Sequence, residues 1–148
     1  YDIKGRKYID TPQKYYFEDL GLRNARIGFR QVEETHLMEN LIYNELRIRG
    51  YLVDVGVVPT RVREPEGAYR RSQLEVDFVC NRGSERVYVQ SAYRLPTEEK
   101  RKQEMASLLK IDDSFRKIII TEDLVKRHMD ENGVEWVNVY DFLKSEDL

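Results

Sequence analysis

Residues 74–93 read LEVDFVCNRGSERVYVQSAY, and they are the most informative part of the chain. Two runs of alternating apolar and polar residues stand in this stretch, which is typical of strands that bury one face. The Gly83-Ser84 pair between the runs suits a type II′ turn. A two-residue turn there pairs Arg82 with Glu85. The sequence therefore predicts an antiparallel hairpin with a defined register.

This register predicts which polar side chains share a face. Counting outward from the turn pairs Asp77 with Gln90, and residues directly opposite each other lie side by side. Alternation adds Glu75, Ala92 and Arg94 to the same face. We therefore expect two strand carboxylates and one amide to converge on one patch. A turn of odd length would reverse this, because a one-residue slip moves every side chain to the other face.

Further elements follow on both sides of the hairpin. Apolar residues at helical spacing predict a helix before it, and Gly50 suits the end of that helix. The predicted order gives an α/β fold with a mixed β-sheet flanked by helices. The predicted elements are a short strand at Lys14–Phe17, a turn at Asp19–Leu22, a helix at Val32–Arg49, a strand at Tyr51–Val58, an exposed loop or hairpin tip at Pro59–Ser72, strands at Leu74–Val79 and Val87–Tyr93, a helix at Thr97–Lys110, a strand at Lys117–Thr121, a helix at Glu122–Asp130, a strand at Val134–Val139 and a helix at Tyr140–Lys144.

Composition limits the class of protein. The chain has 148 residues and a formal net charge of −2, which suits one folded domain and gives no overall electrostatic signature for nucleic acid. One cysteine, Cys80, excludes an internal disulfide framework and a multi-cysteine zinc site. The apolar runs, such as Ile118–Ile120, are far shorter than a membrane span. No signal peptide or GxxxxGK[ST] phosphate loop is present, so we expect a cytoplasmic protein without a membrane partner.

A helix with a glutamate, a strand with an aspartate and a following strand with Glu-x-Lys form the signature of the PD-(D/E)XK nuclease superfamily. The helix pattern resembles ENLIYNEL at residues 39–46, with Glu39 in the acidic position. EVDFV at residues 75–79 resembles the metal-binding strand, with Asp77 as the ligand. YVQSA at residues 88–92 stands where the Glu-x-Lys strand is expected, but it has Gln90 for the acid and Ala92 for the lysine. The resemblance implies a restriction-endonuclease-like mixed sheet.

A closer resemblance covers nearly the whole chain. KYYFEDLGLRNA at residues 14–25, together with the motifs above, is similar to the C-terminal domain of unknown function in a family of predicted prokaryotic AAA-type ATPases. The resemblance implies an N-terminal segment at residues 1–30, which links to an absent upstream ATPase region, and a nuclease-like domain at residues 31–148. The chain starts at Tyr1 rather than Met, which favours a piece of a longer protein. ATP would then bind only in that upstream region, and the ATPase core would be a partner.

The nuclease resemblance defines candidate catalytic and metal-binding residues. It implies that Glu39, Asp77 and Gln90 are vestigial or working ligands of Mg²⁺ or Mn²⁺, which prefer oxygen ligands. Because Gln90 is neutral and Ala92 cannot assist phosphoryl transfer, we favour a degenerate site in an accessory module that binds nucleic acid or protein. A metal-dependent phosphodiesterase, with Arg94 in place of the lysine, is the alternative. Asp77 could also be a structural carboxylate paired with Arg94 or Tyr88, or with Gln90 filling the old metal site.

Four arginines of the predicted loop are candidate nucleic-acid contacts, because basic loops bind phosphate backbones. The alternative is a solvated loop in which Glu64 and Glu66 balance the charge. DNA and RNA are both possible ligands at this point. The four arginines are Arg61, Arg63, Arg70 and Arg71.

Overall fold

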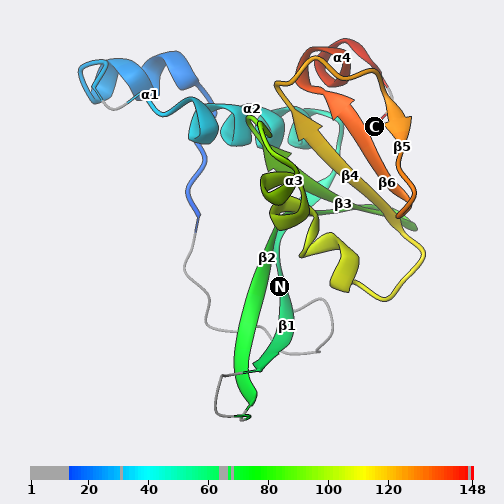
Figure 1. Cartoon of the computed structure of the whole chain (residues 1–148). Coiled ribbons are helices and arrows are strands. Elements are labelled where there is room, and N and C mark those ends of the chain that lie inside the picture. The colour runs from blue at the N-terminus through cyan, green and yellow to red at the C-terminus, as the bar shows by residue number, and fades with distance from the viewer. Residues whose placement is uncertain (1–13, 31, 64–66, 68, 147) are drawn as a thin grey trace.

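The computed structural model describes residues 14–30, 32–63, 67, 69–146 and 148. Within these residues, six strands form one mixed sheet in the order β1-β2-β3-β4-β6-β5 (Figure 1). The expected α/β fold with a mixed sheet flanked by helices is therefore confirmed. The elements are α1 (Leu20–Arg26), α2 (Glu34–Ile48), β1 (Leu52–Arg63), β2 (Tyr69–Arg82), β3 (Glu85–Ala92), α3 (Glu98–Met105), a 3₁₀ turn (Leu108–Lys110), β4 (Arg116–Thr121), β5 (His128–Met129), β6 (Val134–Asn138) and α4 (Val139–Lys144).

The sheet joins an antiparallel half to a parallel half. Strands β1, β2 and β3 pair antiparallel, and β3, β4 and β6 pair parallel. Arg82 pairs with Glu85 across the turn, so the predicted hairpin register is confirmed. The turn needs a glycine, because Gly83 has a φ of 60°. Strand β3 therefore lies inside the sheet, where it contacts β2 on one side and β4 on the other.

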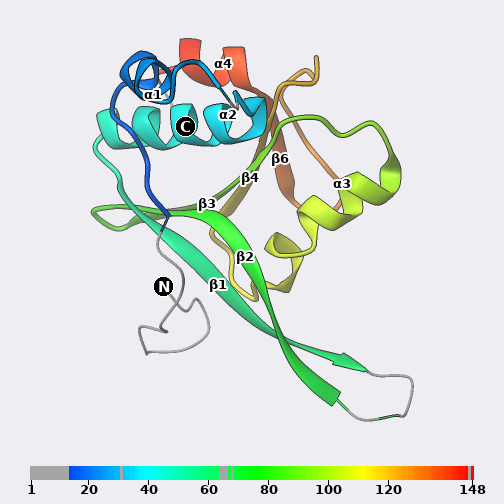
Figure 2. The ribbon, with the colours of Figure 1, turned by 90° about the vertical axis from the view of Figure 1, so that its left-hand side faces the viewer.

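Helices cover both faces of the sheet (Figure 2). On one face, Met38, Ile42 and Leu46 of α2 pack with Phe78 and other strand residues, and α4 joins the same cluster. These α2 residues are spaced by four, so they line one side of the helix. On the other face, α3 and the 3₁₀ turn cover a second cluster that includes Val76, Tyr88, Ala92, Met105 and Leu108. The candidate site lies where α2 crosses the antiparallel half.

Asn138 joins the end of β6 to α4. Its side-chain oxygen accepts from the Tyr140 N–H, and its Nδ2 donates to the backbone carbonyls of Glu122 and Asp123. It is only 5% exposed, so alanine would leave these backbone groups without partners. We expect Asn138→Ala to lower the free energy of unfolding by about 1.5 kcal/mol, measured by urea denaturation. Asn132→Ala, in an exposed turn, is the control, and an equal loss there would contradict the capping role.

Several predicted elements are wrong. Residues 14–17 are not a strand, and the predicted turn at residues 19–22 opens helix α1, because the Asp19 side chain caps it by accepting from the Leu22 N–H. The predicted helix at residues 122–130 is absent, and His128–Met129 instead forms the short edge strand β5. The helix predicted at residues 97–110 ends at Met105 and is followed by a 3₁₀ turn.

Residues 59–72 were predicted as an exposed loop or the tip of a hairpin, and the structure has the hairpin. Strands β1 and β2 continue through it as a two-stranded ribbon, from the Pro59–Gln73 pair to the Arg63–Tyr69 pair. We call this ribbon, Pro59–Arg63 with Tyr69–Gln73, the hairpin arm. It extends away from the body of the molecule (Figures 1 and 2). None of the described helices is long and apolar enough to cross a membrane.

Candidate functional site

Three carboxylates meet around one ammonium group at the crossing of α2 and β2. Lys14 Nζ lies 3.0 Å from Glu39 Oε1, 3.2 Å from Asp77 Oδ1 and 2.5 Å from Glu75 Oε1. Glu39 comes from α2, and the two other acids come from β2. One positive charge therefore faces three negative charges, and the centre keeps a net negative charge. We call these four residues the carboxylate centre.

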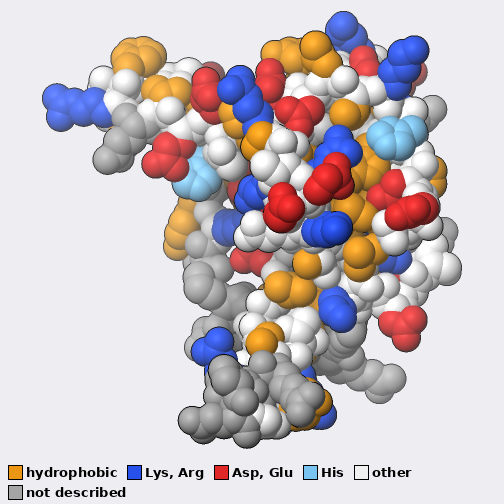
Figure 3. Space-filling view, in the orientation of Figure 1, with side chains coloured by type: hydrophobic (Ala, Val, Ile, Leu, Met, Phe, Trp, Pro, Cys, Tyr) orange, Lys and Arg blue, Asp and Glu red, His pale blue; other side chains and the backbone are white. Residues whose placement is uncertain are grey.

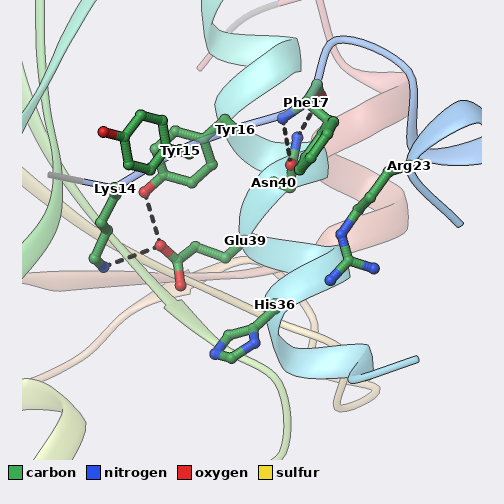
Figure 4. A pocket seen from close by; sticks show the side chains of 8 residues that line it. All are labelled: Lys14, Tyr15, Tyr16, Phe17, Arg23, His36, Glu39 and Asn40. Atoms are coloured by element: carbon green, nitrogen blue, oxygen red, sulfur yellow. Dashed lines mark hydrogen bonds and ion pairs between the residues drawn. The ribbon is translucent and has the colours of Figure 1, made fainter. Parts of the chain in front are cut away.

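The residues before α1 hold Lys14 in place. Tyr16 stacks on Tyr43 of α2, with ring centroids 4.1 Å apart, and its hydroxyl donates to Glu39 Oε1 at 2.8 Å. Asn40 accepts from the Phe17 N–H and donates to the Phe17 carbonyl, both at 2.8 Å (Figure 4). These bonds fix the backbone two and three residues after Lys14. The ammonium is therefore positioned by an ordered segment.

A pocket of about 300 Å³ opens beside the carboxylate centre. The side chains of Lys14 and Tyr16 line this pocket and both point toward Glu39 (Figure 4). Arg23 and His36 also line the pocket, and His36 pairs with Glu33 at 2.9 Å. The centre is therefore accessible from solvent beside Glu39.

Burial and charge set the protonation of the centre. Burial first, and the Glu39 carboxylate second, raise the pKa of Asp77 to about 6, although Lys14 and the Ser91 N–H oppose this rise. Burial alone would lower the pKa of Lys14, but Asp77, Glu75 and Glu39 outweigh it and raise that pKa above the ordinary value. Burial and Glu39 likewise raise the pKa of Tyr16. Lys14 is therefore a stable cation, while Asp77 is an unusually weak acid.

A bulge in β2 explains how Asp77 reaches α2. Asp54 pairs with Val79 but Gly56 pairs with Val76, so β2 has one residue more than β1 in this stretch. Strict alternation fails here: Val76 and Val79 join the α3-side cluster, while Phe78 joins the α2-side cluster. The alternation predicted for this strand is therefore interrupted, and Phe78 lies on the opposite face from Val76.

Gln90 lies on the other side of the sheet from the carboxylate centre. On β3 it shares a face with Tyr88 and Ala92, which both pack on the α3 side. Its Nε2 is 3.5 Å from Glu104 Oε2 of α3. The β2–β3 ladder ends at Phe78–Val89, one pair before the expected Asp77–Gln90 pair. Gln90 still touches Asp77, because its Oε1 accepts from the Asp77 N–H at 3.4 Å. The expected convergence of both side chains on one face is nevertheless wrong.

Two of the partners that the sequence suggested for Asp77 bind elsewhere, and Gln90 contacts only its backbone N–H. Arg94 pairs with Glu122 at 3.2 Å, and the Tyr88 hydroxyl donates to Asp113 at 2.7 Å. Asp77 Oδ2 instead accepts from the Ser91 N–H at 2.9 Å. Ala92 is 3% exposed in the α3-side core. Burial raises the pKa of the Cys80 thiol to about 12, which fits a packing residue.

The sequence identified Glu39 and Asp77 as candidate ligands and placed Glu75 on the same face as Asp77, but it missed Lys14. The ion pair between Lys14 and Asp77 spans 63 positions of the chain, and no local periodicity reports such a contact. The KYYF run at residues 14–17 was the available signal, because a lysine directly precedes a cluster of aromatic residues. The aromatic residues of this run suggested a strand instead.

The carboxylate centre resembles a metal site in its donor atoms, but an ammonium group lies between them. Carboxylate oxygens suit Mg²⁺ and Mn²⁺, and Glu39, Glu75 and Asp77 supply them from three positions. The Lys14 ammonium lies between these oxygens, at ion-pair distance from each. Among the residues that the structure describes, no group of three or more His, Cys, Asp and Glu side chains is arranged to hold a metal ion. In this conformation the centre suits its own ammonium and does not fit a metal.

The four predicted nucleic-acid arginines lie in the hairpin arm. Arg61 pairs with Arg71 across the two strands, and Arg70 pairs with Val62. Arg63 pairs with Tyr69 through its backbone, and its side chain lies outside the described residues, as do Glu64 and Glu66. By alternation, Arg61 and Arg71 share one face and Arg70 lies on the other.

Comparison with known proteins gives one longer relative. The chain is 34% identical over 143 residues, 97% of its length, to an uncharacterized protein of Haemophilus influenzae. These residues span 32% of that protein, so the chain corresponds to about a third of the relative's length. No family model matches the chain, and no solved structure matches it. The function is therefore argued from the geometry.

Proposed function

We propose that this chain is a nuclease-like accessory domain of a larger ATP-binding protein, and that it binds its partner without cleaving it. The observation that carries the proposal is the position of Lys14 Nζ, within 3.2 Å of three carboxylates. In the nuclease pattern, carboxylates at positions such as Glu39 and Asp77 would hold a metal ion, whereas here they hold an ammonium group. Its elevated pKa keeps it charged at neutral pH. Gln90 and Ala92 stand where the nuclease pattern has its acid and lysine, but both face α3, so neither supplies a catalytic group to the centre.

The larger protein in this proposal carries an AAA-type ATPase core, which would bind ATP outside the present chain. The length of the Haemophilus relative is compatible with this, since the matched region is 32% of it. The partner of the domain is then nucleic acid or the ATPase core itself. A nucleic-acid partner predicts an affinity that falls steeply with salt, because bound phosphates release counterions. An ATPase-core partner predicts a much weaker dependence.

The proposal predicts no metal-dependent cleavage. We expect the chain, incubated with DNA or RNA and millimolar Mg²⁺ or Mn²⁺, to give no more product than Asp77→Asn, because Lys14 neutralises the carboxylates that would hold the metal. Product is measured by gel electrophoresis of end-labelled strands. The matched control is Asp54→Asn, which changes an exposed aspartate of β1 outside the centre.

A second candidate function is a metal-dependent phosphodiesterase in which Lys14 replaces the missing strand lysine. The observation in its favour is the same amine, 3.2 Å from Asp77 and 3.0 Å from Glu39. This function would require the ammonium to move aside and admit Mg²⁺ or Mn²⁺. It predicts cleavage that both Asp77→Asn and Lys14→Met abolish and that Asp54→Asn retains. Such a result would replace the proposal of a binding domain.

A further inference from the structure

The hairpin arm is a basic ribbon with the dimensions of a groove-binding element. Residues 59–73 contain four arginines and two glutamates. The last pair packed into the core is Val58 with Leu74, and five further pairs extend beyond it. At about 3.3 Å per residue, these pairs project roughly 17 Å from the body. The major groove of B-form DNA is about 12 Å wide and admits a two-stranded ribbon.

Arg61 and Arg71 form an unfavourable pair in the free protein. Their Cα atoms are partners in the β1–β2 ladder, and both side chains are exposed. Like charges directly opposite each other destabilise a sheet. In the part of the chain that the structure describes, neither arginine has an ion pair to an acid. Bound phosphates, one beside each guanidinium group, would offset their repulsion and would accept hydrogen bonds from them.

The same face of β2 is open along its length. Tyr69, Arg71, Gln73 and Glu75 alternate on it and are all exposed, and Tyr69 is 67% exposed. Glu75 belongs to the carboxylate centre and lies four residues, or about 13 Å, from Arg71. This distance exceeds the Debye length of about 8 Å at physiological salt. The acids of the centre therefore do not cancel the attraction of the arm for a polyanion.

The body of the molecule offers no comparable surface in the view of Figure 3, where acidic and basic side chains are interspersed. The chain as a whole carries a net charge of −2, so it has no general affinity for polyanions. The concentration of arginine on the projecting arm is therefore the feature that distinguishes it.

We infer that the hairpin arm enters the major groove of double-stranded DNA, with Arg61 and Arg71 bound to phosphates at the groove edge. The inference rests on the proposed binding function and names its partner. Double-stranded RNA is a poorer fit, because the major groove of A-form helices is deep and narrow. Single-stranded DNA has no groove to hold both faces of the ribbon.

The test measures binding of a short fluorescein-labelled DNA duplex by fluorescence anisotropy, without divalent metal. We expect Arg61→Gln/Arg71→Gln to weaken binding about tenfold and to lower the slope of log affinity against log salt by about 2, since each phosphate contact contributes about 1. The matched control is Arg26→Gln/Arg30→Gln, which removes two exposed arginines at and just after α1. The control is expected to stay within about twofold of the unaltered chain.

Three results would each overturn the inference. The first is that the chain does not bind duplex DNA, and the second is that both double variants lose the same affinity. The third is that single-stranded DNA or double-stranded RNA binds as tightly as duplex DNA. The cleavage assay under "Proposed function" reports separately on the carboxylate centre. A chain that binds through the arm and also cleaves would refute the non-catalytic proposal and leave this inference standing. A chain that neither cleaves nor binds DNA would refute only the inference.

Discussion

Asparagine in place of Asp77 is expected to stabilise the folded protein by about 3 kcal/mol above about pH 7, and to leave its stability nearly unchanged below about pH 4. The reason is the raised pKa of Asp77, which is about 6 in the folded protein against an ordinary value of 3.8. Each pKa unit corresponds to about 1.4 kcal/mol between the two protonation states. At neutral pH the Asp77 carboxylate is charged, and burial and the nearby Glu39 make this charge destabilising for the folded protein.

The sign follows from proton binding. Between about pH 4 and pH 6 the folded state binds the Asp77 proton more tightly than the unfolded state does, so stability falls as the pH rises. The penalty is absent below the unfolded pKa and complete above the folded one. Asparagine does not titrate, so the difference in stability between the two proteins increases from about pH 4 to about pH 6. Its amide can still accept from the Ser91 N–H and can donate to Glu39.

The measurement is urea denaturation of both proteins at several pH values across this window. Asp54→Asn, at an exposed position of β1, is the matched control and is expected to change stability by less than about 0.5 kcal/mol at every pH. A lower stability of Asp77→Asn at high pH would show that the ion pair with Lys14 outweighs the burial penalty. Gain of stability on loss of a buried charge is the usual sign of a site shaped for function rather than for folding.

The hairpin at the centre of the sheet was predictable because its information is local. Gly83-Ser84 fixes the turn, and alternation on both sides fixes the strands, so the Arg82–Glu85 register follows from counting. The bulge at Asp77 was not predictable, since an extra residue in one strand is defined only by its pairing with β1. This single irregularity turns Asp77 toward α2 and leaves Gln90 facing α3.

Strand pairing that is not visible in the local sequence also explains the other differences between prediction and structure. The short pattern at residues 122–130 suits a helix, but pairing of His128–Met129 with β6 determines the observed strand. Pro59 and the arginines left a loop and a hairpin tip open at residues 59–72, and the pairing of β1 with the long strand β2 decides for the hairpin. Tertiary pairing, rather than local propensity, decides the structure in both cases.

Methionine in place of Lys14 is expected to lower the free energy of unfolding by about 2.5 kcal/mol at neutral pH. Removal of one partner from a buried ion pair commonly costs about 3–5 kcal/mol, and we expect less here because the Lys14 side chain is 28% exposed and that of Glu75 is 51% exposed. Methionine keeps the length of the side chain, so the loss reports mainly on charge. Lys102→Met, at an exposed position of α3, is the control and is expected to change stability by less than about 0.5 kcal/mol.

A double-mutant cycle then decides whether Lys14 acts through the carboxylates. With asparagine at position 77, one of the three negative charges is gone, so Lys14→Met should cost only about 1 kcal/mol and the coupling energy should be about 1.5 kcal/mol. Equal costs in both backgrounds would mean that the ammonium is stabilised by solvent, Glu39 and Glu75, and not by Asp77. The centre would then lack the internal counter-ion on which the non-catalytic proposal depends. A positive coupling that vanishes below about pH 5 would instead follow the protonation of Asp77, since a neutral carboxyl cannot hold the ammonium.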